Sequence, residues 1–258
     1  MQLKTEKTSK GEKKMKGKCY YCGKEISRVS VTKHLKSCLK KEEYQNKVKL
    51  ERKRRKNLFL LQVSYKYNPD DYWMFISIDE NSSLRELDIF LRDVWVECCG
   101  HLSVFKIEGI DYDVDVESAN EYGLIFEKEY ESMDVKIKNV LREGLTFSYE
   151  YDFGNTTHIT IKVLGKQKGY QLSRIEIMAR NNPKEYKCSK CGNKARFYCY
   201  ECSNYYCDEC IENDRSNCYH EIIYEIIEGQ NSPRCGVCGY VYNEKGEDEY
   251  LPKIKSLF

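Results

Sequence analysis

Five Cys-x-x-Cys pairs constrain this chain more than any other feature of its sequence. They are Cys19/Cys22, Cys188/Cys191, Cys199/Cys202, Cys207/Cys210 and Cys235/Cys238. Each pair can present two thiolates to one tetrahedral metal ion, and pairs that recur at short spacing are typical of structural zinc. Such pairs are poorly placed for a disulfide framework, which is the less favoured alternative. Free thiols indicate a reducing compartment, so we expect a cytoplasmic protein.

The first pair belongs to a pattern with zinc-finger spacing. Cys19 and Cys22 are followed after eleven residues by His34 and then by Cys38, which gives Cys-x2-Cys-x11-His-x3-Cys. On a helix, His34 and Cys38 share one face because they are four residues apart, and they can complete a tetrahedron with the two thiolates. The spacing predicts a zinc finger with a final cysteine in place of the second histidine.

Positive charge is concentrated around this finger. Residues 1–57 hold 20 Lys and Arg against 6 Asp and Glu, whereas residues 58–182 hold 13 against 22. Residues 1–18 are lysine-rich and without periodicity, which predicts a disordered basic tail. Residues 39–56 favour a basic helix that extends the finger helix as a rod. A basic head on an acidic body is typical of an arm that binds nucleic acid or an acidic partner; an arm that folds back on its own domain is the alternative.

The finger and rod favour phosphate contacts over base contacts. The outward finger positions are Ser27, Ser30 and Lys33, which include no Arg or Asn with a strong base preference. We therefore expect lysines and arginines of this region to contact DNA or RNA phosphates. The candidate residues are Lys33, Lys36, Arg52, Lys53, Arg54, Arg55 and Lys56. A finger that only organises the N-terminus or binds protein is the alternative.

Residues 58–182 have the pattern of an α+β domain. Strand-like segments are expected at 58–67, 73–78, 102–107, 111–116, 123–128, 145–151 and 158–164. Ser83 and Glu86 form a capping-box signature, and the apolar residues after them recur at helical spacing up to Trp95. This order predicts a mostly antiparallel sheet with one main helix, flanked by small zinc-stabilised modules.

The end of this domain carries a more specific pattern. The run from Leu141 to Gly154, which ends in Tyr-Asp-Phe-Gly and is followed by Thr156-Thr-His158, resembles the hallmark of the plasmid pRiA4b ORF-3-like family. The resemblance covers about residues 58–180, and the segment from Asn231 to Gly239 is similar to the zinc-binding ends of family members. Asn155-Thr-Thr stands where many members carry Asp and Trp, which weakens the transfer of a polar site. The resemblance implies association with plasmids and mobile elements and a link to site-specific recombination.

No catalytic constellation stands out in the sequence. Asp152, His158 and His101 are the acid–base candidates, and a Tyr-Asp-Phe-Gly turn needs its aspartate mainly to bond local amides, so we interpret Asp152 as structural. Cys98 and Cys99 are adjacent, and adjacent thiols chelate poorly. We expect them to be small buried hydrophobic residues rather than ligands.

The last third of the chain, residues 183–258, predicts a zinc module after a linker at 181–183. Alternating pairs resemble a B-box-like cross-brace, in which Cys188, Cys191, Cys207 and Cys210 hold one ion and Cys199, Cys202, Cys218 and His220 hold the other. A sequential alternative gives the second ion to Cys199, Cys202, Cys235 and Cys238. Both arrangements predict three zinc ions for the whole chain, and residues 221–227 are expected to form a strand or short helix.

Three functions remain open. The favoured one is a non-enzymatic, zinc-dependent binding protein whose basic finger engages nucleic acid. The others are an enzyme or recombination accessory factor that uses the central domain, and an adaptor that binds only proteins. No apolar run reaches the roughly 18 residues of a membrane span, so no membrane partner is expected.

Overall fold

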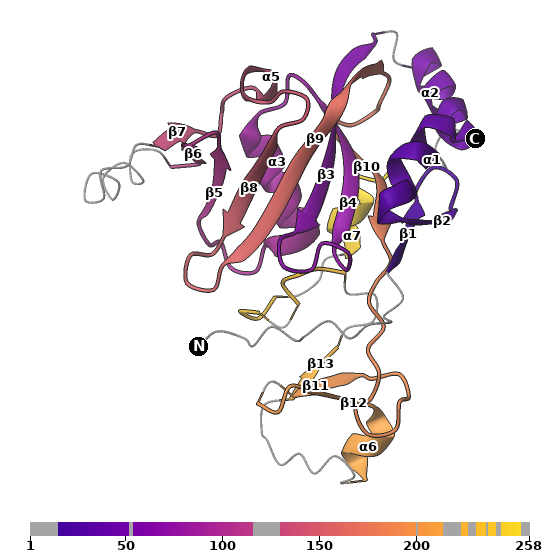
Figure 1. Ribbon diagram of the computed structural model, residues 1–258, viewed down its shortest axis with the longest axis vertical. Helices are drawn as coiled ribbons and strands as arrows, with labels where there is room; N and C mark the ends of the chain where they lie inside the picture. Colours follow the sequence, from indigo (N-terminus) through magenta and orange to yellow (C-terminus); the bar gives the residue numbers. More distant parts are fainter. Residues whose placement is uncertain are drawn as a thin grey trace.

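The computed structural model describes residues 15–51, 54–115, 130–199, 201–213, 223–226, 231–235, 237–240 and 244–253. It is built around a ten-stranded sheet in the order β2-β1-β10-β4-β3-β9-β8-β5-β6-β7 (Figure 1). Every neighbouring pair is antiparallel except β6 and β7. The strands are β1 (Lys16–Cys19), β2 (Glu25–Ser27), β3 (Lys56–Tyr65), β4 (Trp73–Asp79), β5 (Ser103–Ile107), β6 (Ile110–Asp113), β7 (Tyr130–Ser132), β8 (Thr146–Tyr151), β9 (Thr157–Gly169) and β10 (Ile175–Asn181).

The predicted α+β class with one main helix is confirmed. Helix α3 (Leu84–Leu91) begins at a capping box in which the Ser83 hydroxyl accepts from the Glu86 amide and the Glu86 carboxylate accepts from the Ser83 amide. It continues into a π-helical turn, η2 (Arg92–Val96). The predicted strand at 123–128 lies outside the described residues. Strand β10 was not predicted, and Asn181 of the expected linker is its last residue.

Both faces of the sheet are covered, which explains why every residue of β4 and β10 is buried. On one face, Met74, Ile76 and Ile78 pack with α3 and η2. On the other, Trp73 and Phe75 pack with the N-terminal finger. Successive side chains of a strand point to opposite faces, so one strand serves both cores.

The finger is part of this fold. It contains β1, β2, the 3₁₀ turn η1 (Arg28–Ser30) and α1 (Val31–Ser37), and β1 pairs with β10 from Gly17↔Asn181 to Cys19↔Ala179. A Cβ atom at Gly17 would lie 2.1 Å from the Arg180 carbonyl oxygen and 2.4 Å from the Trp73 ring. Only glycine permits β1 to lie this close to the sheet.

The predicted continuous basic rod is wrong. Cys38 adopts an extended conformation (φ −78°, ψ 105°) and separates α1 from α2 (Leu39–Glu51). Helix α2 instead lies along the sheet, with Tyr44 and Val48 buried in the same core as the finger. The chain then enters β3 at Lys56, which pairs with Asp79 at 3.3 Å.

The described elements between Phe197 and Glu225 form a second, smaller unit (Figure 1). A three-stranded sheet has the order β12-β11-β13, with β11 (Phe197–Cys199), β12 (Asn204–Tyr206) and β13 (Ile223–Glu225), and α6 (Asp208–Glu212) follows β12. Strand β13 lies within the predicted 221–227 segment.

Two further helices are α5 (Ile137–Val140) and α7 (Glu244–Asp248). Among the described helices, none is long and apolar enough to cross a membrane.

Candidate metal centres and basic groove

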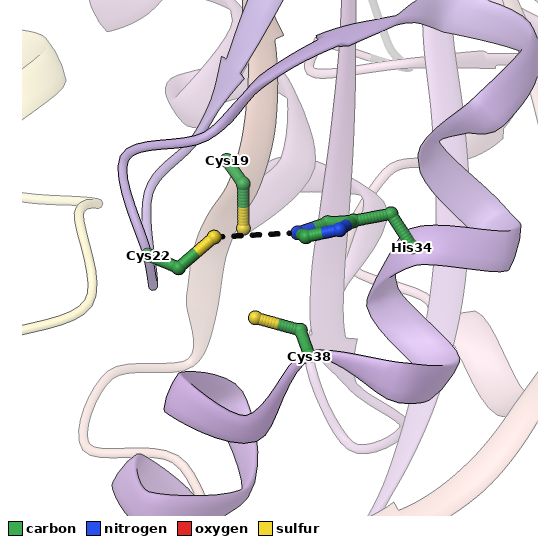
Figure 2. A group of neighbouring side chains, drawn as sticks. All are labelled: Cys19, Cys22, His34 and Cys38. Atoms are coloured by element: carbon green, nitrogen blue, oxygen red, sulfur yellow. Dashed lines mark hydrogen bonds between the residues drawn. The ribbon is translucent and has the colours of Figure 1, made fainter.

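The four predicted finger ligands lie together (Figure 2). Cys19 ends β1, Cys22 lies in the following turn, His34 is on α1 and Cys38 follows that helix; their ligand atoms are all within 4.8 Å of one another. The Cys22 Sγ and His34 Nε2 atoms are 3.4 Å apart. Gly23, with φ +74°, donates its amide to the Cys19 carbonyl and closes the turn.

Burial favours uncharged ligand groups in the finger when no cation is bound. Desolvation raises the pKa of the Cys19 thiol to about 12. Desolvation, with nearby Lys24, lowers the pKa of His34, which favours the neutral imidazole that metals bind. A bound dication would instead favour the thiolate form of the cysteines.

A second group forms in the smaller unit. Cys188, Cys191, Cys207 and Cys210 have their sulfur atoms within 4.8 Å of one another, and the Cys191 and Cys207 sulfurs are 3.6 Å apart. This brings the first and third Cys-x-x-Cys pairs of the region together, as the interleaved arrangement predicts. Cys218 and His220, the proposed partners of Cys199 and Cys202, lie outside the described residues.

The sequential alternative for the second C-terminal site is wrong. Cys199, Cys202, Cys235 and Cys238 are all described and do not form a ligand group. The described residues between 231 and 253 instead return to the large sheet: the Tyr250 carbonyl accepts from the Ile177 amide, and the Asn231 side-chain amide donates to the Asn181 carbonyl at 2.8 Å. The segment that carries Cys235 and Cys238 therefore belongs with the central sheet.

A third group lies where this segment meets the end of η2. It contains Cys98, Cys99, His101 and Cys238, with ligand atoms within 4.8 Å of one another. Cys99 and Cys238 are exposed and Cys98 is partly buried, so the expectation that Cys98 and Cys99 are buried hydrophobic residues is wrong. Three of its members lie close together in the sequence, but nothing local indicates the fourth, because Cys238 is 139 residues from Cys99 and its own Cys-x-x-Cys partner is not a member.

Asp152 has the structural role expected of it. It adopts a left-handed conformation (φ 64°), and its Oδ1 atom accepts from the amides of Gly154 and Asn155 at 3.0 and 3.2 Å. Its Oδ2 atom pairs with the buried Arg234 guanidinium at 2.5 Å, which helps to hold the pKa of Asp152 below its usual value despite desolvation. The His158 Nδ1 atom is 3.4 Å from the Glu150 carboxylate, whereas the His101 Nε2 atom is 3.5 Å from the Asp152 carboxylate.

The predicted nucleic-acid residues divide between two sites. Lys33 and Lys36 are exposed on α1, and Arg54 and Arg55 are exposed before β3. Lys56 is half-buried in β3 beside Asp79. Arg52 and Lys53 lie outside the described residues.

Arg55 lines a groove between α2 and the end of β9. The groove has a volume of about 380 Å³ and no carboxylate among its lining residues. Four of those residues are basic, namely Lys41, Lys49, Arg55 and Lys168; Gln45, Asn46, Gln167, Gly169 and Tyr170 complete the lining. Of these four, only Arg55 is a named candidate from the sequence, although Lys41 and Lys49 lie within the predicted basic helix. Lys168 was not predicted, because it lies near the far end of β9.

Hydrogen bonds join α2, on one side of the groove, to Tyr170, which follows β9 on the other side. The Gln45 side chain donates to the Tyr170 carbonyl at 2.5 Å and accepts from the Tyr170 amide at 2.7 Å. A Cβ atom at Gly169 would lie 3.0 Å from Leu58 and 3.1 Å from the Gln45 Oε1 atom, so glycine permits this close approach.

The central domain matches a known protein family. A family model described as plasmid pRiA4b ORF-3-like protein covers residues 57–186, just over half of the 258 residues. A crystal structure of a protein of unknown function from Methanosarcina mazei Go1 is similar at 15% sequence identity and a TM-score of 0.41, over 48% of this chain and 69% of that one. Among curated proteins, no sequence matches the chain.

Proposed function

The chain belongs to the plasmid pRiA4b ORF-3-like family, and we propose that it is a zinc-dependent, non-enzymatic protein that binds nucleic acid through its basic N-terminal region. The single observation that carries the proposal is the basic groove between α2 and β9, which is lined by four cationic side chains and no carboxylate. The family's association with plasmids is consistent with a nucleic-acid partner.

The chemistry of the ligands supports zinc at the two predicted centres. The finger supplies three sulfurs and one imidazole nitrogen, and the smaller unit supplies four sulfurs. Closed four-ligand sets of sulfur and nitrogen are typical of structural zinc, which leaves no open position for a substrate. Cobalt substitution tests this: each centre should give the visible absorption of tetrahedral thiolate-bound cobalt, and Cys191→Ser should reduce it while the finger's share remains.

The finger would hold the groove in place on the nucleic acid through phosphate contacts rather than contact the base edges. Its outward Ser27 and Ser30 hydroxyls are 2.9 Å apart, and Ser30 also donates to the Ser27 carbonyl. Arg28 pairs with Asp70 at 2.7 Å. These groups are engaged within the protein, while Lys33 and Lys36 are exposed on the same module. We therefore propose contacts to phosphates, which position a protein without selecting a base sequence.

Charge removal from the groove tests this function. In Lys49→Gln/Arg55→Gln/Lys168→Gln, we expect weaker binding to every DNA or RNA sequence and a salt slope reduced by about 0.9 for each duplex phosphate that is no longer neutralised. The matched control, Lys66→Gln/Lys138→Gln/Lys190→Gln, removes three charges from exposed positions elsewhere. Equal weakening in both variants would show that only net charge matters, and the groove would not be the binding site.

A protein-binding role of the smaller unit is a second candidate. The described residues between 184 and 226 carry their own ligand group and lie beside the large sheet rather than within it (Figure 1). If the intact protein bound no nucleic acid at low salt, this adaptor function would replace the proposed one.

A further inference from the structure

We propose that Cys98, Cys99, His101 and Cys238 form a third metal centre, which binds a zinc-class dication and fastens the C-terminal segment to the central domain. The proposal does not depend on nucleic-acid binding, since it concerns residues on another part of the fold. It assigns a role to Cys238, the second cysteine of the last Cys-x-x-Cys pair.

The distances fit a tetrahedral ion. The Cys99 sulfur lies 3.7 Å from both the Cys98 and the Cys238 sulfurs. Zinc–sulfur bonds of about 2.3 Å place two ligand sulfurs about 3.8 Å apart in a tetrahedron. The His101 Nε2 atom is 3.1 Å from the Cys99 sulfur and 3.2 Å from the Cys238 sulfur. Four ligand atoms therefore surround one point from two distant segments of the chain.

The loop that supplies three of the ligands is held in place by other contacts. The Tyr151 hydroxyl accepts from the backbone amides of Cys98 and His101, each at 3.3 Å. Arg92 donates to the His101 carbonyl at 2.9 Å. These bonds fix the backbone between the adjacent cysteines and the histidine, so that the two neighbouring thiols can both point to one ion.

A buried cationic side chain lies beside the three thiol ligands. Three thiolates and one dication leave a net charge of about −1. The Arg234 guanidinium lies 3.4 Å from the Cys98 sulfur and can offset part of that charge, although it also pairs with Asp152. Arg234 is fully buried and sits on the same segment as Cys238, so one segment brings both a ligand and the compensating cation.

The other cysteine of the last pair provides a matched control. Cys235 is three residues before Cys238, yet it does not belong to any ligand group among the described residues. An ordinary zinc knuckle would use both cysteines of the pair. The structure instead assigns only Cys238 to the metal, so the two cysteines should respond differently to substitution.

Native mass spectrometry of the full chain tests this assignment. We expect Cys99→Ser and Cys238→Ser each to carry one zinc ion fewer than the wild type, and Cys235→Ser to carry the wild-type number. An unchanged zinc count in both Cys99→Ser and Cys238→Ser would overturn the proposal, as would the loss of one ion from Cys235→Ser alone.

Alkylation of the wild type gives an answer even if these variants do not fold. Cys99 and Cys238 are exposed, so as free thiols they should react rapidly with iodoacetamide. In zinc-loaded protein we expect both to be protected, and to become reactive after a chelator is added. Rapid modification of Cys99 and Cys238 in the loaded protein, or a disulfide in its intact mass, would contradict a metal centre at this place.

Discussion

Arg234 and Asp152 form a buried ion pair that joins the C-terminal segment to the Tyr-Asp-Phe-Gly turn. Both side chains are almost fully buried, and the same guanidinium also donates to the Asn155 carbonyl and the Thr157 hydroxyl at 3.0 Å. The turn that carries the family resemblance therefore serves as the docking point for residues 82 positions later in the chain.

Loss of Arg234 should destabilise the central domain strongly. In Arg234→Met the Asp152 carboxylate would stay buried without its cation, which typically costs about 3–5 kcal/mol. Urea unfolding, monitored by tryptophan fluorescence, measures the loss in unfolding free energy, because both tryptophans, Trp73 and Trp95, are buried in the domain. The control Arg142→Met breaks an exposed pair with Glu108 and should cost less than about 1 kcal/mol. Similar losses in both variants would contradict the proposed role of the buried pair.

Glu176 should make stability depend on pH. Desolvation raises its folded-state pKa from 4.5 to about 6, while its carboxylate accepts from the Tyr44 hydroxyl of α2. A raised folded pKa contributes stability that is present below pH 4.5 and is lost as the pH rises through about 6. Relative to Glu176→Gln, the wild type should lose about 2 kcal/mol of unfolding free energy over this range. A constant difference between the two proteins at all pH values would rule out this titration.

Addition of one methyl group at Gly17 should disrupt the docking of the finger. The Cβ atom of Gly17→Ala would overlap the Arg180 carbonyl and the Trp73 ring, and overpacking of this kind costs about 1–3 kcal/mol or more. Gly154→Ala is the control, because its Cβ atom would meet Asp152 at an ordinary 3.4 Å. Thermal unfolding should show a lower midpoint for Gly17→Ala than for the control; equal midpoints would mean that β1 can move away without cost.

Cys188→Ser should unfold the smaller unit and spare the large sheet. The described residues of the smaller unit bury few apolar side chains besides the cysteines, namely Ala195 and Tyr206, so the loss of a metal ligand should remove most of its folding free energy. Limited proteolysis should cut within 184–226, yet the fragment with residues 231–253 should remain bound to the central domain through Arg234 and Asn231. If the central domain were degraded at the same rate, the two units would fold as one.

Much of the central fold could be predicted from local patterns. The capping box at Ser83, the helical spacing up to Trp95 and the strand-like segments predicted α3, β3, β4, β8 and the start of β9 within a few residues, because these elements depend on nearby residues. Strand β9 continues to Gly169, beyond its predicted end at 164. The finger ligands also lie together as their spacing predicts, and so do the first and third cysteine pairs of the C-terminal module.

Long-range relationships could not be predicted in this way. The third ligand group forms only because the chain brings Cys238 back to Cys99. The finger joins the sheet through the four-residue strand β1, which can lie beside Trp73 because residue 17 is a glycine. The basic rod was mispredicted because helix propensity and charge in residues 39–56 are continuous, whereas Cys38 turns the chain so that Tyr44 and Val48 can be buried. Such features follow from tertiary packing.

Fluorescence anisotropy of the intact protein with labelled duplex DNA and with single-stranded RNA, over about 50–200 mM salt, tests the central claim most directly. If the four cations of the groove contact phosphates, the logarithm of affinity should fall linearly with the logarithm of salt concentration, with a slope of about −3 to −4 on duplex DNA and little dependence on sequence. No binding at the lowest salt, or binding that does not change with salt, would contradict the account.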